Sequence, residues 1–308
     1  MIRYATLGGA QLFVGAAAIF ARFALGGAGP VAVSYLRLLI AALIVVTLAA
    51  FRSQSRRWLG SRRETALAIA GVALAVHFAG WIASLEFTSI AIATLLVCTS
   101  PIFTGIYEAI VRRHVPSLTF ALAIISGGAG LILAVMQHTT PAPIPGHAWL
   151  GAFLATLGAI AMSVYLTIVR SVRSDLETLA IIARTYAWAA IVLAMLALVI
   201  HENPPALTDR SAWFGIIAMA LISQLLGHTA MNVSLHWFTP TTVGFATLLE
   251  PVIAAILAAV IFREALAGTT LAGAILLFTA IALAIRDQVA QEQSGAGDPS
   301  TPLRFAED

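Results

Sequence analysis

The chain has 308 residues, of which 60% are hydrophobic and only 10% are charged, and its formal net charge is +3. A soluble domain carries about 25% charged residues. This composition therefore excludes a water-soluble globular protein and predicts a helical protein that crosses a membrane many times. The arginines gather at the ends of apolar segments, so the positive net charge does not indicate nucleic-acid binding.

Ten apolar segments follow one another along the chain, each close to the roughly 20 residues that a helix needs to cross a bilayer. The connections are short, except for a basic one and a proline-rich one. A polar tail rich in Gly, Pro, Ser and acidic residues follows from about residue 287, and we expect it to be disordered. The approximate bounds of the ten segments are 5–25, 31–51, 65–86, 89–111, 118–136, 147–169, 177–200, 211–236, 241–262 and 266–286.

The arginines predict the orientation of the chain. With the N-terminus in the cytoplasm, twelve arginines lie in cytoplasmic segments, whereas only Arg210 and Arg263 lie in outer ones. This is a strong positive-inside bias, and ten crossings then place both termini in the cytoplasm. The chain has no lysine and much Ala, Arg and Gly. Such a composition is typical of a GC-rich bacterial genome, so we expect the bacterial inner membrane.

The two halves of the chain resemble each other. HFAGWIASLEFTS begins at His77 and HTAMNVSLHWFTP begins at His228, and the tetrapeptide ATLL occurs at 93–96 and again at 246–249. Since each half holds five spans, an odd number, the second half enters the membrane inverted, as in many transporters. The predicted fold is an all-α membrane protein of ten transmembrane helices. Two inverted five-helix repeats, 1–137 and 147–286, are followed by the tail at 287–308.

The ninth segment carries the strongest candidate residue. Glu250 lies about 14 Å into the membrane at about 1.5 Å per residue. A central charge costs about 2.5 kcal/mol or more on insertion scales, so we expect Glu250 to face a wet cavity or a partner, or to be protonated. Pro251, and Pro101 at the corresponding place in the first half, should kink their helices. The alternative is a protonated glutamate that only holds helices together.

Two sets of polar and aromatic residues could line a cavity. In the third span His77, Phe78 and Trp81 share one face, which suits a zwitterionic or aromatic molecule. In the eighth span Gln224, His228 and Asn232 form a polar stripe, and such a stripe should point inward. The alternative for both sets is helix packing, with satisfied structural histidines. Met162, Ser163 and Tyr165 in the sixth span are weaker candidates.

Arg37 in the second span and Arg184 in the seventh occupy matching positions of the two halves. A guanidinium could bind a substrate carboxylate, or it could hold helices together or snorkel to the interface. Because one substrate rarely uses two pseudosymmetric sites alike, we expect a structural role for both. Small residues at 126–130 and at Gly268 and Gly273 should permit close helix approach. That approach could be between the two halves, or between protomers of a homodimer through spans five and ten.

These features resemble the drug/metabolite transporter superfamily, EamA branch, over about residues 5–286. The likeness rests on Pro30 with Arg37, TSPIF at 99–103, the ATLLEP run ending at Pro251, and Arg263-Glu264, where the family often has Gly-Glu. The resemblance implies ten spans in two inverted repeats and export of amino acids, other metabolites or cationic drugs. Arg112-Arg113 stand where Gly-Glu is common in the first repeat, so the subfamily stays open.

We therefore predict a secondary transporter that exports small metabolites, foremost amino acids, by alternating access. Its cavity should be lined by spans three, four, eight and nine, and Glu250 would bind a coupling proton or a substrate ammonium. The alternatives are efflux of cationic drugs and, more remotely, a membrane protein without transport function. No GxxxxGK[ST], GxSG or HExxH motif occurs, so neither ATP coupling nor an intramembrane enzyme is expected. Two isolated histidines do not suggest haem, and we expect no cofactor or metal.

Overall fold

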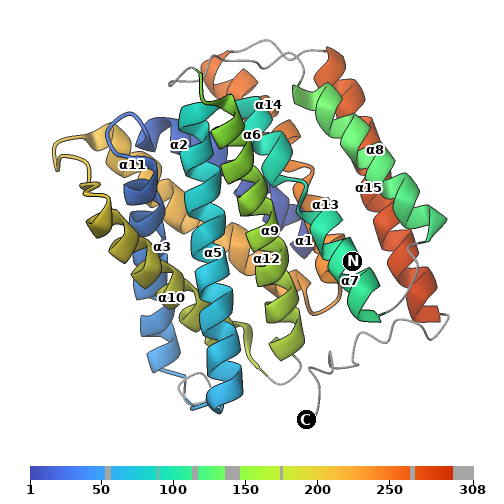
Figure 1. Ribbon diagram of the computed structural model, residues 1–308, viewed down its shortest axis with the longest axis horizontal. Helices are drawn as coiled ribbons and strands as arrows, with labels where there is room; N and C mark the ends of the chain where they lie inside the picture. The colour runs from blue at the N-terminus through green and yellow to red at the C-terminus, as the bar shows by residue number, and fades with distance from the viewer. Residues whose placement is uncertain are drawn as a thin grey trace.

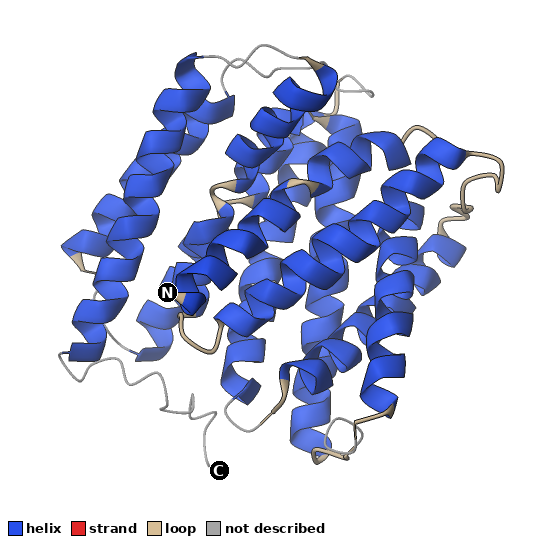
Figure 2. Cartoon of the chain, turned by 180° about the vertical axis from the view of Figure 1, so that it is seen from behind, coloured by secondary structure: helices blue, strands red, loops and turns tan. Residues whose placement is uncertain are grey.

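The computed structural model describes residues 1–52, 57–88, 90–112, 117–135, 146–173, 176–263 and 268–293, and its regular secondary structure there is helical throughout (Figures 1 and 2). The helices of the first half are α1 (Ile2–Gly15), α2 (Ala17–Ala24), α3 (Pro30–Ala50), α5 (Ser61–Phe87), α6 (Ile90–Val97), α7 (Ser100–Arg112) and α8 (Leu118–Val135). Those of the second half are α9 (Ala148–Val172), α10 (Thr178–Val199), α11 (Arg210–Ala218), the π-helix η2 (Met219–His228), α12 (Thr229–Ser234), α13 (Pro240–Thr247), α14 (Glu250–Phe262) and α15 (Gly268–Gln293).

Eight helical segments of the described ranges are long and apolar enough to cross a membrane. Two shorter apolar segments, Ile92–Glu108 and Leu118–Leu133, lie where the fourth and fifth spans were expected. The all-α membrane class is thereby confirmed, whereas ten crossings stay a prediction. Helix α15 continues beyond residue 286 to Gln293, and residues 294–308 of the expected tail lie outside the described residues. So do Arg113 and Glu264 of the two pairs Arg112-Arg113 and Arg263-Glu264.

Two helices are interrupted just before a proline. The first break, at Cys98 and Thr99, separates α6 from α7, and the second, at Leu248 and Leu249, separates α13 from α14. At each break the backbone tightens to bonds between residues three apart, such as that from the Leu249 amide to the Ala246 carbonyl at 3.1 Å. The physical reason is that proline has no N–H to continue the α-helical pattern.

The two breaks meet at the centre of the molecule. Helix α13 packs on α7, and α14 contacts α6. Gly244 lies at this contact, where a Cβ would lie 3.4 Å from the Cα of Pro101. The carbonyl of Thr247, which Pro251 leaves without its helical donor, accepts a hydrogen bond from the Cys98 thiol at 3.6 Å. One interrupted helix from each half therefore forms the crossing.

The first helix of each half packs against helices of the other half. Helix α1 packs on η2, α12, α13 and α14, whereas α9 packs on α5, α6 and α7. Equivalent helices of the two halves also pair, α3 with α10 and α8 with α15. Figure 1 shows α8 and α15 side by side at one edge, and Figure 2 shows the same pair from behind. The two halves thus form one interlocked bundle.

The small residues expected in the fifth and tenth spans pack against each other within one chain. A Cβ on Gly130 would lie 2.8 Å from the Gly273 carbonyl oxygen and 2.9 Å from the Cβ of Leu276. The Ser126 hydroxyl donates to the Leu276 carbonyl at 2.9 Å. This face therefore serves the contact between the two halves.

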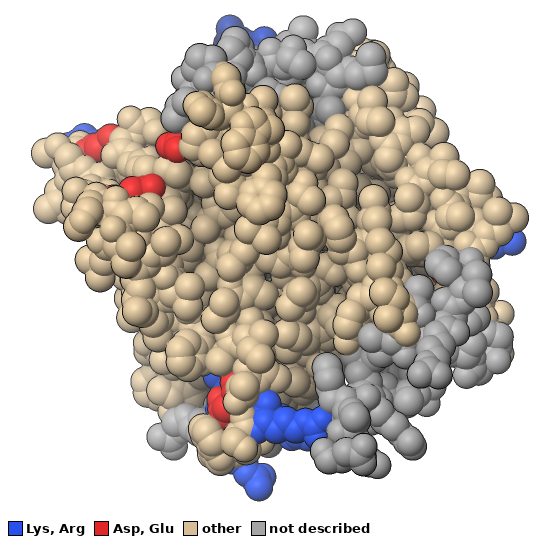
Figure 3. Space-filling model, in the orientation of Figure 1, with Lys and Arg blue, Asp and Glu red and all other residues tan. Residues whose placement is uncertain are grey.

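The beginning of α1 and the end of α15 lie at the same end of the bundle. The ring of Tyr4 contacts that of Phe238, with centroids 5.6 Å apart, just after α12. At the same turn the Gln288 amide of α15 donates to the Trp237 carbonyl and accepts from the Thr239 amide, both at 3.0 Å. Figure 3 shows that charged side chains lie at the margins of the face it displays and leave its broad middle uncharged, as expected of a membrane-facing surface.

A methyl group on Gly130 tests the contact between α8 and α15. We expect Gly130→Ala to force the helices apart and to lower the free energy of unfolding by about 1–3 kcal/mol, measured as a lower melting temperature in detergent. The matched control is Gly128→Ala on the same helix, where a Cβ meets nothing within 4 Å. It should keep or raise the melting temperature, because alanine favours helix. Equal melting temperatures for the two variants would contradict this packing.

Candidate functional site

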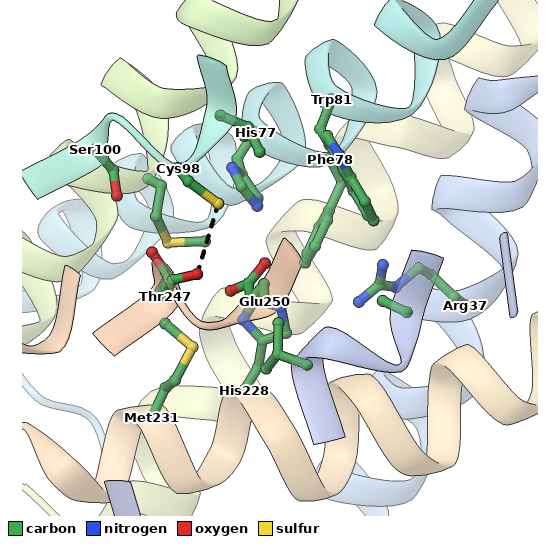
Figure 4. Close-up of a pocket in the computed structure, with 14 residues that line it drawn as sticks. Arg37, His77, Phe78, Trp81, Cys98, Ser100, His228, Met231, Thr247 and Glu250 are labelled. Carbon is green, nitrogen blue, oxygen red and sulfur yellow. Dashed lines mark hydrogen bonds between the residues drawn. The ribbon is translucent and has the colours of Figure 1, made fainter. Parts of the chain in front are cut away.

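A cavity lies where the two interrupted helices cross (Figure 4). The space between its lining atoms is about 430 Å³, part of it open to the outside, and the expected spans three, four, eight and nine all contribute to its wall. Helices α1 and α2, which the sequence did not indicate, contribute as well, together with α3 through Arg37 and α9 through Met162. The polar lining residues are Arg37, His77, Cys98, Ser100, His228, Thr247 and Glu250, and the apolar ones are Val14, Ala17, Phe78, Trp81, Val97, Met162 and Met231.

The free space in this cavity is small. The centres of water-sized molecules can occupy about 30 Å³ of it. One water molecule needs roughly 10–15 Å³ measured in this way, so the cavity has room for about two waters. An amino acid or a larger solute fits only if the walls move apart, and this conformation is therefore a closed one.

Glu250 occupies the first turn of α14, directly after the second break. A carboxylate in that position is favoured by the positive end of the helix dipole. Figure 4 shows it at the centre of the cavity, and part of its surface stays accessible. Among the described residues, no side chain hydrogen-bonds to it and no cation lies within 4 Å, while Arg37 acts on it electrostatically from farther away. Glu250 is thus available to a solute.

Arg37 is fully buried in α3 and lines the cavity. Its Nη2 donates to the side-chain oxygen of Gln224 at 2.8 Å. Its Cζ lies 4.0 Å from the centre of the Phe78 ring, a cation–π distance. An acidic and a basic side chain therefore lie on different walls of one cavity without forming an ion pair.

The two intramembrane histidines lie near each other across Phe78. The His77 Nδ1 donates to the Gly158 carbonyl at 3.0 Å, since a carbonyl oxygen can only accept. The His77 and His228 ring centroids are 6.5 Å apart, and Phe78 lies 4.8 Å from the first and 5.1 Å from the second. Within the described ranges the Nδ1 of His228 has no hydrogen-bond partner. No group of three or more metal-ligating residues occurs there either.

The predicted stripe of the eighth span is divided between different surroundings. Of its three residues only His228 lines the cavity. Gln224 holds Arg37, and Asn232 exchanges hydrogen bonds with the Tyr165 hydroxyl at 2.8 and 2.9 Å. The stripe assumed α-helical spacing, whereas residues 219–228 form a π-helix, in which each turn holds an extra residue. Asn232 lies beyond this π-helix, in α12, and neither it nor Gln224 lines the cavity.

Arg184 lies away from the cavity, although it matches Arg37 in sequence position. Its Nε contacts both carboxylate oxygens of Glu64, at 2.9 and 3.0 Å. Its terminal nitrogens donate to the carbonyls of Ala180 and Arg57 at 3.1 and 2.9 Å. The repeat-related arginines thus have different surroundings.

Several lining residues were missed by sequence reasoning. Cys98, Thr247 and Ser100 lie in apolar runs, and only their positions beside the predicted kinks could have indicated them. Met231 adjoins the predicted stripe without belonging to it. The cavity is therefore more sulfur-rich than was expected.

Comparison with known proteins decides the family. The model of the EamA-like transporter family matches residues 4–136 and, a second time, residues 149–286. The chain belongs to this family. Family membership places this EamA-type chain in the drug/metabolite transporter superfamily and makes it a membrane transporter by descent.

A solved structure titled only as the crystal structure of a protein resembles this EamA-family chain, with a TM-score of 0.74 at 17% identity. The likeness covers 91% of this chain and 96% of that one, and at this identity it shows the fold alone. No curated protein matches the chain.

Removing the Tyr165 hydroxyl tests whether the bond to Asn232 holds α9 to α12. We expect Tyr165→Phe to cost about 1–3 kcal/mol of unfolding free energy, because a buried amide loses its partner. The measurement is the melting temperature in detergent. As a control, Thr279→Val removes an exposed hydroxyl that bonds only to its own helix and should change little. An unchanged melting temperature for Tyr165→Phe would refute the structural role.

Proposed function

We propose that the protein is a secondary transporter of the bacterial inner membrane that exports small metabolites, foremost amino acids, by alternating access. The observation that carries this proposal is the closed cavity at the crossing of the two breaks, with the unpaired carboxylate of Glu250 on its wall. A discontinuous helix that presents a polar group at the midplane is how many transporters build their substrate site.

Ten crossings in two inverted repeats are part of the proposal. The double match of the family model supports two copies of one unit. The reciprocal packing of α1 and α9, and the pairing of α3 with α10 and of α8 with α15, support a pseudo-twofold relation between them. In this topology α6 and α7 together make the fourth crossing, and α8 makes the fifth.

Both termini would then face the cytoplasm. The contact of Tyr4 with Phe238 and the bonds of Gln288 to the same turn support one common side for the two ends of the bundle. The excess of arginines on that side, expected from the sequence, supports its assignment as the inside. Association of two copies through the outer faces of α8 and α15 stays a prediction.

The size of the cavity supports a cycle in which the walls separate. Only about two waters fit in the closed state, so entry of a solute requires bending, and Pro101 and Pro251 are the natural points for it because the helical hydrogen bonds are already broken there. In this cycle Glu250 binds the ammonium group of an amino acid, or a proton that enters as the substrate leaves.

Efflux of cationic drugs is the alternative. Glu250 would suit a cation equally well, and the aromatic rings of Phe78 and Trp81 could add cation–π attraction. The two proposals differ in whether the cavity also binds an anionic group. An enzyme is not proposed, because the family is one of transporters.

Neutralising Glu250 tests the proposal. We expect Glu250→Gln to slow efflux of amino acids from loaded proteoliposomes by about 10-fold or more, since bonds to charged groups contribute about 1.5–3 kcal/mol. Glu177→Gln is the matched control, because Glu177 is exposed at the start of α10, and it should transport at the unmodified rate. A wild-type protein that moves no solute would sink the transport proposal itself, and an unaffected Glu250→Gln would remove Glu250 from the site.

A further inference from the structure

In the described part of the molecule, one buried arginine, Arg37, has unused hydrogen-bond donors and no counter-ion. Arg37 is 0% exposed, yet its Nε and Nη1 have no hydrogen-bond partner among the described residues. No carboxylate lies within ion-pair distance of it there. Buried charges are ordinarily paired, whereas this guanidinium has no anionic partner among the described residues.

The repeat-related Arg184 shows what a purely structural arginine looks like in this fold. It binds both oxygens of Glu64. At the spacing that relates His77 to His228, Glu64 corresponds to Gly215, so the second half supplies no acid at the equivalent position. The lack of a counter-ion for Arg37 therefore follows from the residue type at this position.

The surroundings of Arg37 hold the guanidinium in place without neutralising it. The Gln224 oxygen fixes Nη2, and the Phe78 ring lies 4.0 Å from Cζ. Gln224 is itself fully buried, in the π-helix η2, and makes no other side-chain bond within the described residues. Figure 4 shows the guanidinium directed toward the part of the cavity that holds Phe78 and Glu250.

We infer that Arg37 is the carboxylate-binding group of the transport site, positioned by Gln224, and that the substrates are zwitterions. This inference rests on the proposed transport function and names its substrate class. The carboxylate of an amino acid accepts N–H bonds from Arg37, and its ammonium group faces Glu250 on another wall. Among the described residues no second arginine lines the cavity, so a doubly charged phosphate is disfavoured.

The rest of the lining selects the substrate side chain. Phe78, Trp81, Met162 and Met231 surround the charged pair with apolar and polarizable surface. Such a wall favours aliphatic, thioether and aromatic side chains over charged ones. Leucine, methionine and phenylalanine are therefore suitable probes.

The test compares amino acids with ligands that lack either the carboxylate or the ammonium group. Binding of L-leucine, L-methionine and L-phenylalanine to the detergent-purified full chain is measured by calorimetry, beside their amino alcohols, which keep the ammonium, and isocaproate, which keeps only the carboxylate. We expect each amino acid to bind about 10-fold or more tightly than its alcohol. Arg37→Gln should abolish this difference while leaving the affinity for the alcohols unchanged.

Two further variants separate positioning from folding. Gln224→Glu brings a carboxylate to Nη2 of Arg37, so it should weaken binding of L-leucine and isocaproate but not of L-leucinol. This variant also serves if Arg37→Gln does not fold. The control Arg184→Gln should lower the melting temperature and keep the preference for carboxylates.

The outcomes distinguish this inference from the proposed function. If the protein binds carboxylates through Arg37 but moves no amino acid in proteoliposomes, transport of amino acids fails and the binding role stands. If wild-type protein binds and moves only amines and cationic dyes, the role of Arg37 is overturned and transport stands. A preference for carboxylates that survives in Arg37→Gln overturns the inference as well.

Discussion

The structure depends on how one backbone carbonyl is satisfied inside the membrane. Pro251 cannot donate to the carbonyl of Thr247, so that carbonyl needs a donor from outside its own helix. The thiol of Cys98, at the break of the other half, makes the contact instead. The breaks of the two helices thus lie against each other. The cavity lies at this point, where both helices are interrupted.

The same crossing explains why charged groups are tolerated there. A lone carboxylate or guanidinium in hydrocarbon is costly, yet Glu250 and Arg37 both border the cavity, where the two groups attract each other over a distance longer than an ion pair. An ion pair would satisfy both groups and leave nothing for a solute. Because the two side chains are separate, each keeps hydrogen-bonding capacity for a ligand. A zwitterion could then bind with its carboxylate at Arg37 and its ammonium group at Glu250.

The sequence was informative wherever a rare residue stood in an apolar run. The all-α membrane class follows from the length of those runs, and Glu250 was singled out because a carboxylate at mid-span is rare. Arg37 and Arg184 were expected to play the same structural role, yet a repeat in sequence does not imply equal contacts: Arg184 binds Glu64, and Arg37 contacts Gln224 and Phe78. The counterpart of Glu64, which is Gly215, was the available signal.

Two features were beyond any reading of the sequence. The π-helix η2 is the first, because nothing in MALISQLLGH distinguishes it from an α-helical segment. The participation of Cys98 and Thr247 depends on the breaks of the two halves meeting in space. Local residue patterns predict kinks, whereas contacts between distant kinks arise only when the whole bundle packs.

The central claim is that the cavity opens alternately to the two sides of the membrane with a substrate between Arg37 and Glu250. The most direct measurement uses Cys98, the one cysteine of the chain, which lines the cavity. The rate of its alkylation by a membrane-impermeant maleimide is measured in right-side-out and in inside-out vesicles. The account predicts slow labelling from both sides, further slowed by L-leucine in each case. Labelling from one side only, or rates that no amino acid changes, would contradict it.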